Sequence, residues 1–317
     1  MTRSGTLPAM EAGRRAFRAR SHSSRVVDRV WRLVGVLALV VAVAAACGSD
    51  DSASGVSTTA ISSTAGPGTS AAVRPAVLVL TKTAGFRHTS IEPAAAALVA
   101  GLGAAGIDVV VDPDAAHVTD QGLAPFNSVV MLSTTGDWLD DAQQAALEKW
   151  AATGGGVAGI HAATDAEPAW SFLEELFGTR FASHPAVQPA TVVIEDPTHP
   201  ATVRLPTRWT VTDEWYNFTR NPRDRVHVLA AVDETTYAGG VMGPDHPIEW
   251  SREPSAISGR MWYTAMGHPD ELWADPTFTA HVVAGVAWTA GVSIPGVTSL
   301  TTGFSASAVA RRTARIR

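Results

Sequence analysis

The chain has 317 residues, of which 46% are hydrophobic and 17% charged, and its formal net charge is −6. An acidic chain is a poor nucleic-acid binder, because phosphate backbones bind basic surfaces. The single cysteine excludes an intrachain disulfide, so the fold must depend on its hydrophobic core.

Residues 1–46 have the pattern of a signal peptide. Eight arginines and two acidic residues lie in 1–32, and fourteen apolar residues follow, from Leu33 to Ala46. That run is short for a membrane span and suits the apolar region of a signal peptide. Cys47 follows three alanines, as in a lipobox, where the cysteine is lipidated and becomes the mature N-terminus. We therefore expect a lipoprotein on the extracytoplasmic face of the cell membrane; the alternative is an ordinary secretory signal with an incidental cysteine.

Two further segments, 47–74 and 292–317, have few large apolar side chains. The first is rich in Ser, Thr, Gly and Ala and predicts a flexible tether, and the second predicts a low-complexity tail with a basic end. Removal of 1–46 would leave 16 basic and 28 acidic residues, a net charge of −12. The folded part is therefore expected over 75–291, which is long enough for one sizeable domain.

The first half of this domain alternates between strand and helix patterns. Apolar runs typical of strands buried on both faces lie at 75–81, 107–112, 127–133 and 156–160. An alanine-rich helix is predicted over 91–106, and a second between Asp140 and Gly154, with Asp140 and Gln143 placed to cap it. Alternating strands and helices predict an α/β fold, with a mostly parallel sheet and helices on both of its faces.

Beyond about residue 180 the pattern changes to strands without clear helices between them. The candidate strands are 190–196, 225–232, 247–251 and 260–266. A closing helix is predicted over 275–291, because Asp275 suits its N-cap and Pro276 its first turn.

Polar side chains follow three of the predicted parallel strands, at the point where each strand ends. Since ligands of such sheets bind beyond the carboxyl ends of the strands, these loops are expected to meet at one site. Their candidate site residues are Lys82, Arg87, His88, Asp137, Trp138, His161 and Asp165.

The second half contributes more titratable and aromatic candidates. Four histidines there precede a proline, which holds the backbone extended: His184, His199, His246 and His268. The candidates of this half are His184, Asp213, Glu214, Trp215, Tyr216, His246 and His268. Several histidines beside carboxylates suit acid–base chemistry near neutral pH. The alternative is a divalent metal, although HExxH and CxxC spacings are absent from the sequence. Nucleotide-binding glycine motifs are absent too, so no cofactor is expected apart from that metal.

Several motifs together resemble the ThuA-like (trehalose utilisation) family. They are "KTAGFRHTSI", "TTGDWLDDAQQAALEKW", "GGGVAGIHAATD", "FASHPAVQPATV", "TDEWYNF" and "GPDHPIEW", in the expected order over about 76–291. The resemblance implies a flavodoxin-like layered fold, similar to class I glutamine amidotransferases. His161 stands where those enzymes carry a nucleophilic cysteine. Because 75–291 contains no cysteine, glutamine hydrolysis through a thioester is excluded.

The resemblance also implies a role in carbohydrate metabolism. The expected substrate is a small-molecule carbohydrate, in particular a 3-keto-glycoside made by a partner sugar dehydrogenase. The keto group acidifies the neighbouring C–H, so a lyase, isomerase or hydrolase could work through a histidine or carboxylate base. The catalytic candidates are His88, His161, His184, Asp213 and Glu214, and the other site residues are expected to bind substrate. The alternative is a non-catalytic carbohydrate-binding surface lipoprotein.

His161 is expected at a sharp turn between a strand and a helix. The small residues Ala162 and Ala163 would allow the turn and leave a partly exposed imidazole pointing into a cleft. The N-terminus of the following helix would lower the pKa of that imidazole and keep it neutral at pH 7.

Overall fold

The computed structural model describes residues 73–294. The predicted signal peptide, Cys47, nearly all of the tether and most of the tail lie outside the described residues. Within 73–294, no helix has the length and apolar character needed to cross a membrane.

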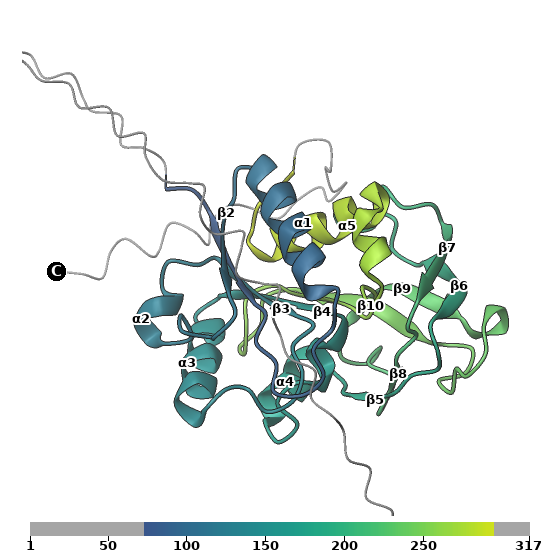
Figure 1. The fold of residues 1–317 in the computed structure, drawn as a ribbon, viewed down its shortest axis with the longest axis horizontal. Helices are drawn as coiled ribbons and strands as arrows, with labels where there is room; N and C mark the ends of the chain where they lie inside the picture. The colour runs from purple at the N-terminus through teal and green to yellow at the C-terminus, as the bar shows by residue number, and fades with distance from the viewer. Residues whose placement is uncertain (1–72, 295–317) are drawn as a thin grey trace, which may run out of the picture. The chain divides into compact units, whose positions relative to one another are not determined.

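The described residues form a nine-stranded sheet and a separate two-stranded one (Figure 1). The large sheet has the order β2-β1-β3-β4-β11-β10-β9-β6-β7, and β5 pairs with β8. The strands are β1 (Ala76–Leu80), β2 (Asp108–Asp112), β3 (Ser128–Leu132), β4 (Gly156–Ile160), β5 (Phe181–Ser183), β6 (Gln188–Ile194), β7 (Arg208–Asp213), β8 (Asn217–Phe218), β9 (His227–Asp233), β10 (Pro247–Arg252) and β11 (Met261–Thr264).

Five neighbouring strands, from β2 to β11, pair in parallel. Every residue of β3 and β4 is buried, as expected for strands covered on both faces. Helices α1 and α5 lie on one face of the sheet, and α3 and α4 lie on the other (Figure 1). The predicted α/β fold with a layered, largely parallel sheet is therefore confirmed.

The remaining strands extend the sheet in antiparallel fashion, so that β11, β10, β9, β6 and β7 follow one another. Strand β7 forms the outer edge, and its side chains alternate partly between exposed and buried positions. This half of the sheet brings the end of β7 near the parallel half, and residues 214–216 follow directly from it.

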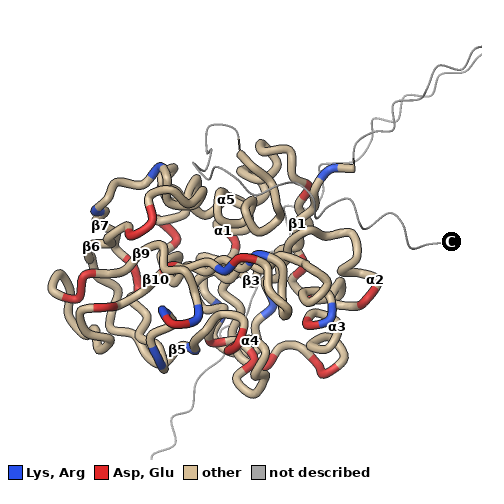
Figure 2. The backbone as a smooth tube through the Cα atoms, turned by 180° about the vertical axis from the view of Figure 1, so that it is seen from behind, with Lys and Arg blue, Asp and Glu red and all other residues tan. Residues whose placement is uncertain are grey.

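The described residues contain five α-helices, of which two begin at the caps that the sequence predicts. The five are α1 (Ile91–Ala104), α2 (Asp120–Leu123), α3 (Asp141–Ala152), α4 (Ser171–Phe177) and α5 (Pro276–Thr289), with 3-10 helices at His161–Asp165, Glu234–Thr236 and Asp270–Ala274. Asp140 and Gln143 form a complete capping box on α3, and Asp275 accepts backbone hydrogen bonds at the start of α5. Acidic and basic residues are interleaved along the chain (Figure 2).

Gly159 of β4 marks a close approach between the sheet and α4. A Cβ atom at this position would lie 2.7 Å from the ring of Phe177 and 2.9 Å from that of Tyr263. Both rings are fully buried and cannot move without disturbing the core.

We expect Gly159→Ala to lower the free energy of unfolding by about 1–3 kcal/mol, since overpacking forces buried rings from their places. Gly103→Ala is the matched control, because a Cβ at this exposed position of α1 meets no atom within 4 Å. The free energy of unfolding of this control should rise by about 0.5–1 kcal/mol, because alanine has a better helix propensity than glycine. Urea denaturation measures both changes, and equal effects of the two substitutions would contradict the packing argument.

Candidate functional site

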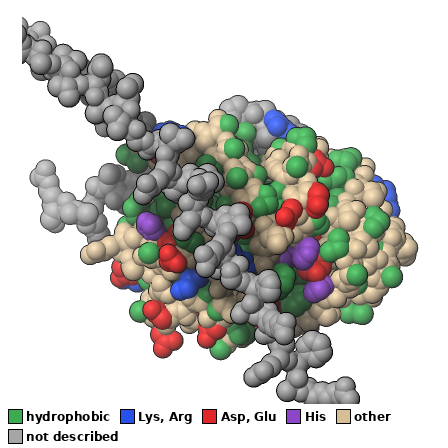
Figure 3. All heavy atoms as spheres, in the orientation of Figure 1, with side chains coloured by type: hydrophobic (Ala, Val, Ile, Leu, Met, Phe, Trp, Pro, Cys, Tyr) green, Lys and Arg blue, Asp and Glu red, His purple; other side chains and the backbone are tan. Residues whose placement is uncertain are grey.

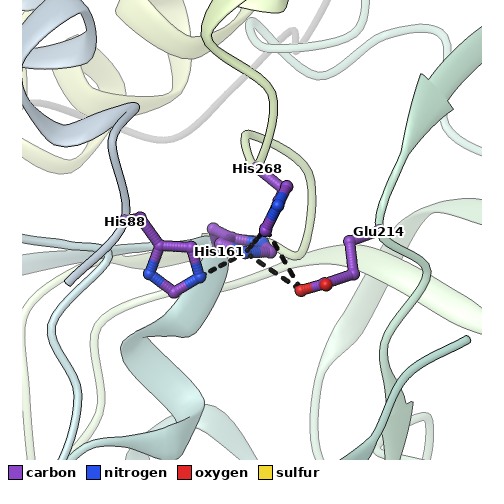
Figure 4. Close-up of side chains that lie close together, drawn as sticks. All are labelled: His88, His161, Glu214 and His268. Atoms are coloured by element: carbon purple, nitrogen blue, oxygen red, sulfur yellow. Dashed lines mark hydrogen bonds and ion pairs between the residues drawn. The ribbon is translucent and has the colours of Figure 1, made fainter. Parts of the chain in front are cut away.

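Three parallel strands and one antiparallel strand deliver the side chains of one buried cluster, which consists of His88, His161, Glu214 and His268. His88 lies in the loop after β1, His161 directly follows β4, and His268 lies in the loop after β11. Glu214 directly follows β7. The four side chains point toward one another (Figure 4). The cluster therefore lies beyond the carboxyl ends of the strands, at the edge where the sequence predicts a site.

The polar atoms of the cluster are close together. His161 Nε2 lies 3.2 Å from His88 Nε2 and 3.3 Å from His268 Nδ1. Glu214 Oε2 lies 3.2 Å from His268 Nδ1 and 3.6 Å from His161 Nε2. The hydroxyl oxygen of Tyr216 is 3.1 Å from His161 Nε2, so it completes the surroundings of that nitrogen.

His161 occupies the sharp turn that its neighbours predict, with a φ of 51° in the left-handed region. Its Nδ1 is 2.8 Å from the carbonyl oxygen of Ala265. A carbonyl only accepts hydrogen bonds, so Nδ1 carries the proton in the neutral ring and Nε2 presents its lone pair to the cluster. The hydroxyl of Tyr263 donates to the backbone carbonyl of His161 and holds the turn.

Two expectations about His161 need correction. Its imidazole is 0% exposed, not partly exposed, because Tyr216, His88 and His268 pack around the ring. Its pKa is lowered well below the usual value, as expected, but burial is the main cause, followed by the charge of His88. His161 is itself the first residue of a five-residue 3-10 helix, whose dipole is much smaller than that of the expected α-helix.

The neighbouring histidines differ in their protonation. Burial lowers the pKa of His88 to about 4, and the charge of His268 adds to the effect. The pKa of His268 is raised, chiefly by its hydrogen bond to Glu214. The cluster thus combines two neutral imidazoles with a third that keeps its proton to higher pH.

Glu214 links the buried cluster to the protein surface. Its Oε1 lies 2.8 Å from Nδ1 of His184, whose side chain is 42% exposed. Nδ1 of His184 also lies 3.0 Å from the carbonyl oxygen of Pro185, so both neighbours favour a proton on Nδ1. The Nε2 lone pair of His184 remains available for a ligand. Histidine and acidic side chains reach the surface side by side on the face drawn in Figure 3.

Asp213 positions the loop that carries His268. Its carboxylate is fully buried and accepts hydrogen bonds from the backbone N–H of Gly267, at 2.8 Å, and of His268, at 3.1 Å. It also accepts a bond from the N–H of Glu214. Burial raises the pKa of Asp213 to about 7. The residue therefore acts on the cluster through the backbone.

The other candidates lie outside the cluster. Trp215 is buried and its indole N–H donates to the carbonyl of Gln188. His246 is buried against Tyr237, Glu234 and the carbonyl of Tyr216. Trp138 is buried, Arg87 pairs with Glu92, and the remaining three are partly or fully exposed: Lys82, Asp137 and Asp165.

Two buried polar residues were not predicted from the sequence, and one of them, Tyr263, supports the site. Tyr263 holds the His161 turn, but its place within an apolar strand offers no signal. Glu167 is fully buried, and its carboxylate accepts hydrogen bonds from the backbone N–H of Trp138 and Leu139 and from Gln144. Glu167 precedes Pro168, the same signal that singles out His184 and His268.

Comparison with known proteins points to one family. The family profile "ThuA: Trehalose utilisation" matches residues 76–289. A ThuA-like protein from Bacteroides uniformis has a solved structure that aligns at a TM-score of 0.57 with 24% identity, over 68% of this chain and 91% of that one. The solved structure of a ThuA-like protein from Parabacteroides merdae aligns at a TM-score of 0.56 with 19% identity. The alignment covers 69% of this chain and 91% of that one. These two likenesses concern the fold. No curated protein matches the chain significantly.

We expect Asp213→Ala to lower the free energy of unfolding by about 2–4 kcal/mol, because it leaves two buried N–H groups of the 267–268 loop without an acceptor. Asp213→Asn keeps one acceptor oxygen, so it should lower the free energy of unfolding by less than Asp213→Ala does. Urea denaturation of the two variants and the wild type measures the difference. If both variants were as stable as the wild type, the positioning role of Asp213 would be refuted.

Proposed function

The chain belongs to the ThuA (trehalose utilisation) family over residues 76–289, and on this premise we propose that it is an enzyme acting on a carbohydrate at the His88, His161, Glu214 and His268 cluster. The proposal rests on one observation. The carboxylate of Glu214 joins this buried cluster to the exposed imidazole of His184. Glu214 contacts His161 and His268 with one oxygen and His184 with the other.

The pair of His184 and Glu214 suits a general base. A carboxylate that holds Nδ1–H of a histidine orients the ring and stabilises the imidazolium that forms when Nε2 takes a proton. His184 is exposed enough to meet a substrate, whereas His161 is enclosed. We therefore assign the base to His184, and we assign the buried cluster to binding and polarising an oxygen atom of the sugar.

A 3-keto-glycoside fits such a site chemically. The keto group acidifies the C–H at C2, so Nε2 of His184 would accept that proton while the bond from C1 to the glycosidic oxygen breaks. The imidazolium of His184 would then give the proton to the leaving oxygen and return to its neutral form. The products are an enone of the sugar and the free alcohol, and neither a nucleophile nor a redox cofactor is consumed. Such a substrate has to come from a dehydrogenase that oxidises the C3 hydroxyl, which is the partner activity that we propose.

We expect His184→Gln to lower kcat/KM on the 3-keto substrate by about 10²–10⁴-fold, the usual contribution of a general base. His227→Gln is the matched control, because His227 is an exposed imidazole that pairs with Asp196 at 2.8 Å away from the cluster. The full chain is incubated with disaccharides and their 3-keto forms, and the products are followed by mass spectrometry. Substrate binding without turnover in the wild type would favour the non-catalytic carbohydrate-binding alternative.

We also propose that the enzyme is a lipoprotein on the extracytoplasmic face of the membrane, supported by the apolar run that ends in Ala-Ala-Ala-Cys47. Replacement of Cys47 by serine should release the protein from the membrane fraction, because the thiol is the site of lipidation. Cell fractionation and immunoblotting measure the distribution. Equal membrane retention of mutant and wild type would refute the anchor.

A further inference from the structure

We propose that His88, His161, His268 and Glu214 bind one divalent transition-metal ion of the Zn²⁺ type. Each residue offers one ligand atom, and the four atoms lie within 4.8 Å of one another. The inference that the metal binds rests on the geometry of the cluster. Any part of the metal in catalysis rests on the proposed function.

The spacing of the ligand atoms suits a small cation at their centre. Zinc lies about 2.0–2.1 Å from its nitrogen and oxygen ligands, so the edges of a tetrahedral site measure about 3.3 Å. Four of the six distances in the cluster are close to this length, and the other two are no longer than 4.8 Å. The edges from His161 are 3.2 Å to His88 and 3.3 Å to His268. The edges from Glu214 are 3.2 Å to His268 and 3.6 Å to His161.

The hydrogen bonding of His161 fixes it in the ligand form. Nδ1 donates to the carbonyl of Ala265, which leaves Nε2 unprotonated and directed into the cluster. A backbone carbonyl that sets the tautomer in this way is the usual support of a metal-binding histidine. Three polar atoms lie 3.1–3.3 Å from this one nitrogen, more than a single lone pair can accept from. A cation would satisfy the His88, His161 and His268 lone pairs together.

Two other ligands show features that point the same way. Glu214 has Oε1 held by His184, so Oε2 is free to face the cluster. His88 is 6% exposed, and its Nδ1 has no hydrogen-bond partner among the described residues. A proton on Nδ1 leaves the Nε2 lone pairs of His88 and His161 facing each other at 3.2 Å, an arrangement that a shared cation stabilises.

The donor set determines the class of metal. Three imidazole nitrogens and one carboxylate oxygen suit Zn²⁺, Co²⁺ and related ions, whereas Mg²⁺ and Ca²⁺ prefer oxygen ligands throughout. When bound, such an ion supplies a Lewis acid that polarises a carbonyl or hydroxyl oxygen.

The test uses the full chain, purified without a histidine tag and treated with a chelator that is then removed. Titration calorimetry with Zn²⁺ should give one ion per chain, and Co²⁺ should produce the visible absorption bands of a four-coordinate nitrogen and oxygen site. Mg²⁺ at the same concentration should not compete. The Co²⁺ spectrum is recorded on the wild type, so it does not depend on how well any variant folds.

His268→Ala removes a ligand whose side chain is 27% exposed, so the fold should tolerate it. We expect this variant to bind Zn²⁺ at least about 100-fold more weakly, while the control His227→Gln binds like the wild type. Absence of stoichiometric binding in the wild type, or equal binding by folded His268→Ala, would overturn the metal site. Zinc binding without turnover of any glycoside would sustain the site and refute the proposed function. Turnover by metal-free protein would sustain the proposed function and refute a catalytic part for the metal.

Discussion

The hydrogen bond between Nδ1 of His161 and the carbonyl of Ala265 is the contact on which the site depends. It joins the end of β4 to the loop after β11, and it fixes which nitrogen of the imidazole faces the cluster. The left-handed turn at His161 and the hydroxyl of Tyr263 hold the ring in position for this bond. Parallel pairing of β4 with β11 supplies the register, since Ile160 lies opposite Thr264.

The first half of the fold was predictable because each strand and helix there has a strong local pattern. The strand over 156–160 agrees with β4, and Asp140 caps α3 as its sequence indicates. Parallel strands end at the same edge of a sheet, so proximity of His88 and His161 follows from the topology alone. The complete burial of His161 does not follow from the topology of the first half. It depends on the rings of Tyr216 and His268, which belong to the second half of the chain.

The second half was less predictable because its strands are irregular, with register shifts between β9 and β10. Strand β7 lies at the sheet edge and carries a mixed, only partly apolar pattern, so it is missing from the predicted strands, although the motif "TDEWYNF" at its end singles out Glu214. The histidine–proline signal was equally ambiguous. His184 and His268 reach the site, whereas His246 is enclosed in hydrogen bonds elsewhere. A proline restricts the backbone of the residue before it, but it does not decide which way the side chain faces.

The position of β7 at the edge of the sheet affects the dynamics of the site. Strand β7 is hydrogen-bonded to β6 alone, whereas β4 has strands on both sides. An outer strand opens at a lower free energy than the centre of a sheet, which is the hierarchy that amide hydrogen exchange reports. An opening of β7 would move Glu214 together with Asp213, whose carboxylate holds the backbone of His268, while His88 and His161 stay at the ends of inner strands. Half of the cluster therefore depends on an edge strand of the sheet.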